Sequence, residues 1–149
     1  MNALRFVRFG AEHLPVFQSW FEDEATRHWL STPDLRWFEF VTTDPQTFAW
    51  MIYDGNVPIG QAQVGHYNDD SRQASIACAV APDRRNRGYA THLLHHLLRQ
   101  TELADVEQFH AFVHPDNGAS VRLVHKTGFQ LVSPQPDEDG FLHYAWFRQ

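Results

Sequence analysis

The chain has 149 residues, 43% of them hydrophobic and 20% charged, and its 12 basic and 18 acidic residues give a net charge of −6 with histidine neutral. This length fits one domain, over residues 1–149, with a core of its own. The composition excludes a disordered or fibrous chain. The acidic excess argues against a nucleic-acid partner, because proteins that bind nucleic acid usually carry a basic excess.

Two features of the sequence bear on the compartment. The single cysteine, Cys78, cannot form an internal disulfide, and the opening residues lack the apolar stretch of a secretory signal. No apolar run approaches the roughly 20 residues that a membrane helix requires. We therefore expect a cytoplasmic protein without a membrane partner.

Hydrophobic periodicity and turn residues predict strands and helices along the chain. In chain order we expect a strand at 4–9, helices at 12–21 and 23–29, irregular chain to residue 46, strands at 47–53, 57–67 and 73–81, a helix at 88–101, a strand at 109–113, a helix at 117–127, and strands at 129–132 and 141–147. Residues 30–46 are predicted to be irregular because Pro33 and Pro45 interrupt any long helix. The order predicts an α/β (α+β) fold, with a mixed sheet of about seven strands flanked by helices.

Positive charge is concentrated in one segment of this acidic chain. Residues 84–99 hold four arginines and no acid, whereas the segments before and after them carry net charges of −6 and −4. Within the segment an arginine-rich loop follows a strand, and a helix opens at Gly88. A helix start presents unpaired N–H groups and the positive end of the helix dipole, which together bind phosphate or pyrophosphate. The pattern predicts an anion-binding loop, and a solvated arginine-rich turn is the alternative.

The loop lacks the two common phosphate-binding fingerprints but matches a third motif. A Walker loop requires a lysine that is absent here, and a dinucleotide fingerprint requires three glycines. Residues 85–90 match the signature Q/R-x-x-G-x-G/A, and the blocks at 117–120 and 126–129 resemble N-x-x-S and K-x-G-F in the same order. Together these motifs resemble the GNAT superfamily of N-acetyltransferases. They are closest to its branch that acetylates ribosomal-protein N-termini and small amines.

The resemblance implies both a fold and a reaction. The fold is a single-domain GNAT fold with a mixed, mostly antiparallel sheet, in which a splayed pair of parallel strands holds acetyl-CoA. The reaction is direct transfer of acetyl from acetyl-CoA to a primary amine, on a small amine, an aminoglycoside-like compound or a protein N-terminus. A non-catalytic acyl-CoA-binding domain of the same fold is the alternative, and a nucleotide-binding module is a third reading. We expect no metal, and a monomer or homodimer.

The resemblance also implies which residues contact the cosubstrate. The expected contacts are the backbone of Cys78, Ala79 and Val80, the loop residues Arg84, Arg85, Asn86, Arg87, Gly88, Tyr89 and Ala90, and the side chains of Asn117 and Ser120. Among the side chains of the loop, the first two arginines are the expected phosphate partners. Asn117 has an alternative role as a helix N-cap.

The catalytic acid and base do not carry over from the family. Val124 stands where many members have a tyrosine that protonates the leaving thiolate, and Ser75 stands where a glutamate base is frequent. An aliphatic ammonium has a pKa of about 10, so a base must still remove a proton before the amine attacks. We expect His110 and His114 to relay that proton. His66 and Asp69 are further candidates.

Aromatic and acidic residues near the start of the chain are candidates for the acceptor side. Trp20, Glu24 and Trp29 would suit a cationic amine, because carboxylates and aromatic faces both attract one. The alternative is a buried aromatic core beside a solvated acidic face. His92 and His96 have a spacing that can chelate a metal, but no further ligand pattern completes a site.

Overall fold

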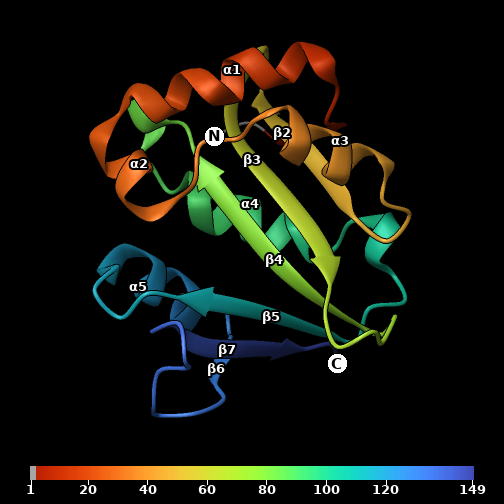
Figure 1. Cartoon of the computed structure of the whole chain (residues 1–149), viewed down its shortest axis with the longest axis vertical. Helices are drawn as coiled ribbons and strands as arrows, with labels where there is room; N and C mark the ends of the chain where they lie inside the picture. Colours follow the sequence, from red (N-terminus) through yellow and green to blue (C-terminus); the bar gives the residue numbers. More distant parts are fainter. Residues whose placement is uncertain (1–2) are drawn as a thin grey trace.

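One seven-stranded sheet organises residues 3–149, which the computed structural model describes (Figure 1). Its strands are β1 (Leu4–Arg8), β2 (Phe48–Asp54), β3 (Val57–His66), β4 (Gln73–Val80), β5 (Gln108–Val113), β6 (Gln130–Leu131) and β7 (Leu142–Phe147). They lie in the order β1-β2-β3-β4-β5-β7-β6, and every neighbouring pair is antiparallel except β4 and β5, which are parallel. This arrangement confirms the predicted fold class.

Helices cover both faces of the sheet. The α-helices are α1 (Leu14–Ser19), α2 (Glu24–Trp29), α3 (Leu35–Thr43), α4 (Tyr89–Leu97) and α5 (Gly118–Lys126). The short 3-10 helices are η1 (Ala11–His13), η2 (Trp20–Glu22), η3 (Pro82–Arg84) and η4 (Thr101–Leu103). No helix within residues 3–149 is long and apolar enough to cross a membrane.

Strand β2 shows how the two apolar layers are built. Trp50 and Ile52 pack in a cluster with α4 and α5 on one face, whereas Ala49 and Met51 pack in a second cluster with α1, η2 and α3 on the other. All four side chains are buried because successive residues of a strand point to opposite faces and helices cover both faces here. The second cluster reaches only as far as β4.

The face that α1 to α3 cover is open over β5 and β7. Phe109 and Ala111 of β5 point into the cluster under α4 and α5. The alternate residue Phe112 points to the other face and is 41% exposed, and Phe147 of β7 is 48% exposed. One half of this face is therefore covered by the N-terminal helices, which do not extend over the other half.

The prediction of irregular chain at residues 30–46 is wrong, because α3 forms within it. Asp34 caps this helix by accepting a hydrogen bond from the backbone N–H of Trp37 at 2.9 Å. Pro33 stands directly before the cap and Pro45 follows the last turn. The two prolines therefore bracket the helix instead of breaking it. The other predicted helices and strands are confirmed to within a few residues of their ends.

Helix α4 packs closely on β3, and a glycine permits the approach. A Cβ atom at Gly60 would lie 2.5 Å from Cδ1 of Leu93 and 3.0 Å from the carbonyl oxygen of Ala79. Leu93 is fully buried. Any larger residue at this position would push α4 away from the sheet.

We expect Gly60→Ala to lower the free energy of unfolding by about 1–3 kcal/mol, because the added methyl group overpacks this contact. The matched control is Gly65→Ala in the same strand, where the nearest atom to the added Cβ is Thr47 Oγ1 at an ordinary 3.5 Å. Urea denaturation of both variants measures the difference. Equal stabilities would show that the close approach to Leu93 is not a constraint.

Candidate functional site

A gap opens within the sheet between β4 and β5. The two strands pair at only three positions, of which Ser75 opposite His110 is the last. Beyond this point β4 stays paired with β3 as far as Val80, and β5 stays paired with β7 as far as Val113. Figure 1 shows the two strands diverging from their shared end. The two strands thus separate while each keeps its other neighbour in the sheet. The resemblance implied such a splayed pair.

The β4 edge of the gap presents backbone groups to it. The N–H of Ala81 donates to the carbonyl of Ile59 in β3 at 2.8 Å. Because hydrogen-bonding directions alternate along an antiparallel strand, the N–H and C=O groups of Cys78 and Val80 point toward β5. Ala79 was expected to line the gap with them, but its backbone groups point to β3. That expectation is wrong for Ala79.

The β5 edge presents matching groups. The N–H of Arg148 donates to the carbonyl of Glu107 at 2.8 Å, just before β5. By the same alternation the backbone groups of His110 and Phe112 point toward β4. His110 lies at the end of the pairing, so Phe112 faces the gap. An extended chain with amide groups can therefore hydrogen-bond to both edges.

The surroundings of the Cys78 thiol disfavour its reactive thiolate form. Its side chain packs against the cluster that contains α4, and burial raises the pKa of the thiol to about 11. At neutral pH the reactive thiolate form is therefore almost absent. A raised pKa disfavours a covalent step on Cys78, the one cysteine of the sequence.

The predicted anion-binding loop has the backbone conformation that such a loop requires. Gly88 is the N-cap of α4 and has a φ of 82°, in the left-handed region that favours glycine. Asn86 also lies in that region, with a φ of 62°. No side chain caps the helix, so the N–H groups of its first turn are open to a ligand. We refer to residues 82–90 as the cradle.

The arginines of the positive segment do not act as one group. Arg87 is exposed and makes no ion pair or side-chain hydrogen bond within residues 3–149. Nε of Arg84 is buried without a hydrogen bond, 4.0 Å from Oδ1 of Asp83. Arg85 is already engaged: it donates to Asp23 Oδ2 at 2.9 Å and to Thr26 Oγ1 at 2.6 Å, at the start of α2. Arg84 and Arg87 are therefore the side chains available to a phosphate, and the prediction that Arg85 serves one is corrected.

Two other expected cosubstrate residues have structural partners. Oδ1 of Asn117 accepts a hydrogen bond from the N–H of Ser120 at 3.3 Å, which makes Asn117 the N-cap of α5. The hydroxyl of Tyr89 donates to a carboxylate oxygen of Asp54, and this hydrogen bond raises the pKa of the tyrosine. Both side chains hold local structure, whereas the backbone N–H of Tyr89 belongs to the cradle.

The three residues predicted for the acceptor side fall in different places. Trp20 is only 8% exposed and packs against Phe17 with ring centroids 5.5 Å apart, so it is a core residue and that prediction is wrong. Glu24 and Trp29 are exposed on α2. The ring of Trp29 lies 5.5 Å from that of His114, which follows β5. Helix α2 therefore reaches across the wide end of the gap.

His110 is buried at the narrow end of the gap with both ring nitrogens engaged. Nε2 lies 2.8 Å from Oε1 of Gln73, and Nδ1 lies 2.8 Å from Nε2 of His143. The ring of Tyr67 stacks on it, with centroids 3.8 Å apart. Burial lowers the pKa of His110, and the charge of His143 lowers it further. His110 is thus closed to direct contact with an acceptor.

The other proton-relay candidates have partners elsewhere. Nδ1 of His114 accepts from the backbone N–H of Asp116 at 3.1 Å. Nε2 of His66 lies 2.6 Å from Asp44 Oδ2, and hydrogen bonds from Thr47 and then His66 lower the pKa of Asp44. His66 therefore serves the end of α3.

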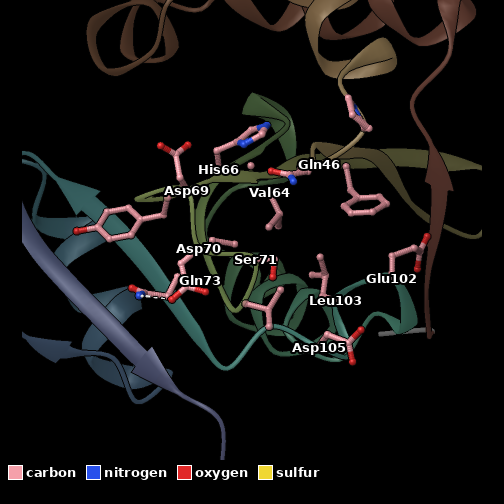
Figure 2. A pocket seen from close by; sticks show the side chains of 16 residues that line it. Gln46, Val64, His66, Asp69, Asp70, Ser71, Gln73, Glu102, Leu103 and Asp105 are labelled. Carbon is pink, nitrogen blue, oxygen red and sulfur yellow. Dashed lines mark hydrogen bonds between the residues drawn. The ribbon is translucent and has the colours of Figure 1, made fainter.

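A separate cavity lies at the narrow end of the gap (Figure 2). It has a volume of about 240 Å³, and acidic residues are prominent in its lining: Asp69, Asp70, Glu102 and Asp105. Gln73, at the start of β4, lines this cavity. The other end of β4, at Val80 just before the cradle, is seven residues further on, or about 23 Å at about 3.3 Å per residue. His66 and Asp69 line this cavity instead of the wide end of the gap.

Sequence reasoning missed Tyr67, Gln73 and His143. Each lies on or beside a strand that was predicted, but only the sheet brings them to His110. No motif marks them, and the register between β5 and β7 would have been needed to find them. The pair His92 and His96, with rings 4.6 Å apart, gains no third ligand, and residues 3–149 contain no group of three or more potential metal ligands.

Comparisons with known proteins agree with this geometry. Residues 3–130 match the family described as acetyltransferase (GNAT) domain. The chain is 30% identical over 140 residues to the uncharacterized N-acetyltransferase YfmK of Bacillus subtilis, and the match covers 93% of each chain.

Two solved structures share the fold at low identity. The aminoglycoside acetyltransferase AAC(6')-Ib, in complex with coenzyme A and kanamycin, superposes with a TM-score of 0.79 at 19% identity and covers 98% of this chain and 95% of its own. The spermidine N-acetyltransferase of Vibrio cholerae, in complex with CoA and spermine, has a TM-score of 0.82 at 15% identity and covers 97% of this chain and 95% of its own.

The raised pKa of Cys78 gives a prediction about its reactivity. Because the pKa rises from 9.0 to about 11, iodoacetamide should alkylate the folded protein at pH 8 about 100 times more slowly than a free thiol. The rate should rise about tenfold per pH unit up to pH 9.5. Mass spectrometry measures the labelling, with urea-unfolded protein as the control. Equal labelling of folded and unfolded chains would refute the assignment.

Proposed function

Because this chain belongs to the GNAT family of acetyltransferases, we propose that it transfers acetyl from acetyl-CoA to the primary amine of a small cationic molecule. The family establishes an acetyl-CoA-dependent N-acetyltransferase. The nature of the acceptor and the roles of individual residues are the proposal.

The observation that carries the proposal is the continuity between the gap and the cradle. Strand β4 leads directly through η3 to Gly88, so the open backbone of the strand and the open N-terminus of α4 form one continuous surface. A pantetheine arm with its two amides fits between the strand edges, and a pyrophosphate fits the helix start. Arg84 and Arg87 supply charge-assisted hydrogen bonds to phosphate.

The same edges provide the chemistry at the thioester. A backbone N–H of Cys78 or Val80 directed into the gap would polarise the thioester carbonyl and stabilise the oxyanion that forms when an amine attacks. The raised pKa of the Cys78 thiol disfavours an acyl-enzyme on that residue, which supports direct transfer of acetyl from sulfur to nitrogen. The wide end of the gap is the entry for the acceptor.

Acidic residues on both sides of that entry favour a cationic acceptor. Glu22 and Glu24 lie at the start of α2, on either side of Asp23, which is paired with Arg85, and residues 137–139 lie in the loop before β7. Between them, Trp29, His114 and Phe141 form a line of rings with centroids 5.5 and 6.3 Å apart. Carboxylates and aromatic faces attract an ammonium group together. Relatives of this fold that are solved with kanamycin or spermine support the choice of a small polyamine or aminoglycoside.

A peptide N-terminus is the second candidate acceptor. The open face of β5 and β7, with Phe112 and Phe147 exposed, leaves room for a chain longer than one small molecule. This observation favours a protein acceptor, as in the branch that acetylates ribosomal proteins.

The decisive experiment incubates the protein with acetyl-CoA and a panel of amines, and measures release of free CoA thiol. We expect release with polyamines and aminoglycosides, and none with their fully N-acetylated forms. Release with N-terminal peptides alone would favour the second candidate. Acetyl-CoA binding without release by any amine would instead indicate a non-catalytic acyl-CoA-binding domain.

A glycine variant tests the cradle separately. We expect Gly88→Val to weaken acetyl-CoA binding at least about tenfold, because a β-branched side chain both disfavours a φ of 82° and blocks the approach of the pyrophosphate. The matched control is Gly140→Val, which has a φ of 86° and no atom within 4 Å of the added Cβ. Calorimetry on both folded variants measures the affinities, and a normal affinity for Gly88→Val would refute the cradle.

A further inference from the structure

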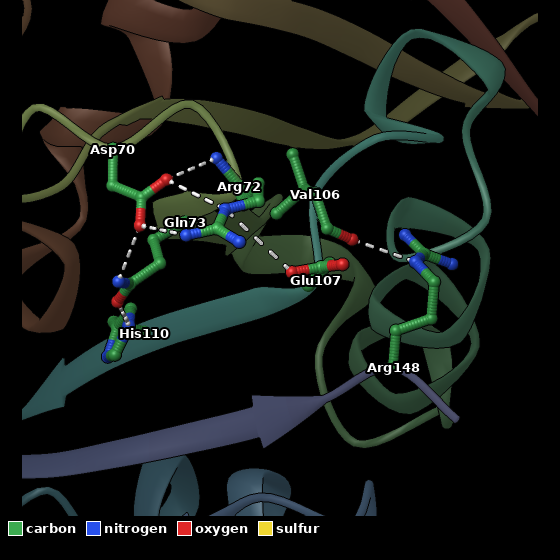
Figure 3. Close-up of polar contacts among 7 residues, drawn as sticks. All are labelled: Asp70, Arg72, Gln73, Val106, Glu107, His110 and Arg148. Carbon is green, nitrogen blue, oxygen red and sulfur yellow. Dashed lines mark hydrogen bonds and ion pairs between the residues drawn. The ribbon is translucent and has the colours of Figure 1, made fainter.

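Four polar side chains form one hydrogen-bonded chain beside the gap. Nε2 of Gln73 donates to Oδ2 of Asp70 at 3.2 Å, and Oε1 of Gln73 lies 2.8 Å from Nε2 of His110. Figure 3 shows these two hydrogen bonds, which connect the turn before β4 to β5. A third hydrogen bond joins Nδ1 of His110 to Nε2 of His143 at 2.8 Å.

The carboxylate end fixes the direction of each hydrogen bond. The backbone N–H of Arg72 and then the Gln73 amide lower the pKa of Asp70, so its carboxylate only accepts. Gln73 therefore donates through Nε2 and accepts through Oε1. Because Oε1 can only accept, Nε2 of His110 must carry the proton of this hydrogen bond. A neutral His110 then accepts at Nδ1, which places the proton of His143 on Nε2. Nδ1 of His143 keeps a free lone pair.

His143 stands where this lone pair can reach an acceptor. It is the register partner of Phe112, which faces the gap beyond the last β4–β5 pair, and neighbouring strands lie about 4.8 Å apart. The ring of Phe112 stacks on it at 4.7 Å and holds its plane. Nδ1 of His143 has no hydrogen-bond partner within residues 3–149 and is not fully buried. The nitrogen is therefore partly accessible on the half of the face that the N-terminal helices leave uncovered.

We propose that His143 is the general base of the reaction and that its Nδ1 removes a proton from the acceptor ammonium. This proposal rests on the proposed function of the chain. His110, Gln73 and Asp70 are positioning residues, because each acts on the acceptor only through His143.

The proton transfer precedes attack on the thioester. One N–H bond of the acceptor ammonium breaks and a new N–H bond forms at Nδ1 of His143, which gives a neutral amine and an imidazolium. The amine nitrogen attacks the carbonyl carbon, and the C–S bond breaks with its electron pair on sulfur. The second proton of the amine goes to the thiolate and yields the CoA thiol, and the imidazolium returns its proton to water.

The surroundings of the two rings keep them neutral at pH 7. Burial lowers the pKa of His143, and the nearby carboxylate of Asp137 offsets part of this effect by raising it. The groups that face the ring are His110, Tyr67 with its centroid 5.9 Å away, and Asp137. Since the ordinary histidine value is about 6.5, a lowered pKa leaves the basic form in excess at neutral pH.

The test replaces His143 with glutamine, whose amide N–H can still donate to His110 but which has no basic nitrogen. We expect His143→Gln to lower kcat about 100-fold at pH 7, with the KM for the amine within about threefold, because general-base catalysis contributes on the order of 10²–10⁴. His95→Gln, on the exposed side of α4, is the matched control and should retain wild-type kcat.

The pH profile separates a base from a structural residue. Wild-type kcat should fall below a pKa under 6.5 and be flat above it, whereas the rate of His143→Gln should rise about tenfold per pH unit from 7 to 9.5, as solution supplies the neutral amine. A variant that keeps wild-type kcat and its acidic limb would overturn the role of His143 alone. A wild-type protein that acetylates no amine would overturn the proposed function as well.

The tautomer can be read without any acceptor. In ¹⁵N NMR spectra at pH 7, His143 should be neutral with its proton on Nε2, and Gln73→Leu should produce a mixture of tautomers, because the hydrogen bond that fixes His110 is lost. A proton on Nδ1 of His143 in the wild-type protein, or an imidazolium at pH 7, would contradict the proposal whatever the acceptor is.

Discussion

The parallel pairing of β4 with β5 ends after three residue pairs, and both halves of the site depend on that end. Each strand keeps its outer partner, so the separation costs only the hydrogen bonds between the two strands. Those unused N–H and C=O groups remain directed into the gap, where an amide-containing ligand can restore them. The unpaired backbone groups of the two strand edges are therefore what the sheet offers to a ligand. The antiparallel neighbours of β4 and β5, together with α4, keep these edges rigid.

Cationic and acidic groups both border the wide end of the gap. At the wide end, the positive start of α4 with Arg84 and Arg87 faces the place where phosphates belong. Acidic segments on α2 and before β7 border the route by which an amine would arrive. The net charge of −6 is thus unevenly distributed: under the function proposed above, a small cationic region would attract the anionic donor and the acidic remainder would attract a cationic acceptor.

The parts of the site that local chain geometry determines could be predicted from sequence. The cradle is such a part, because a glycine in the left-handed region at a helix start needs only neighbouring residues. The grouping of Tyr67, Gln73, His110 and His143 could not be predicted, since it depends on the register of three strands. Trp20 was misassigned for a related reason: an aromatic residue looks the same in a core as in a binding wall until its packing is known. Helix α3 was missed because a proline just before a helix cap has the same local signature as a proline that breaks a helix.

The side-chain contacts of Arg85 couple the cradle to α2. Its guanidinium joins the cradle to the first turn of α2 through Asp23 and Thr26, across 62 and 59 residues of sequence. The segment proposed to bind the donor and the segment proposed to border the acceptor thus share one ion pair. Positions 23 and 85 are consequently expected to be replaced together during evolution, and a new acceptor preference gained on α2 carries a cost in the loop that holds the donor.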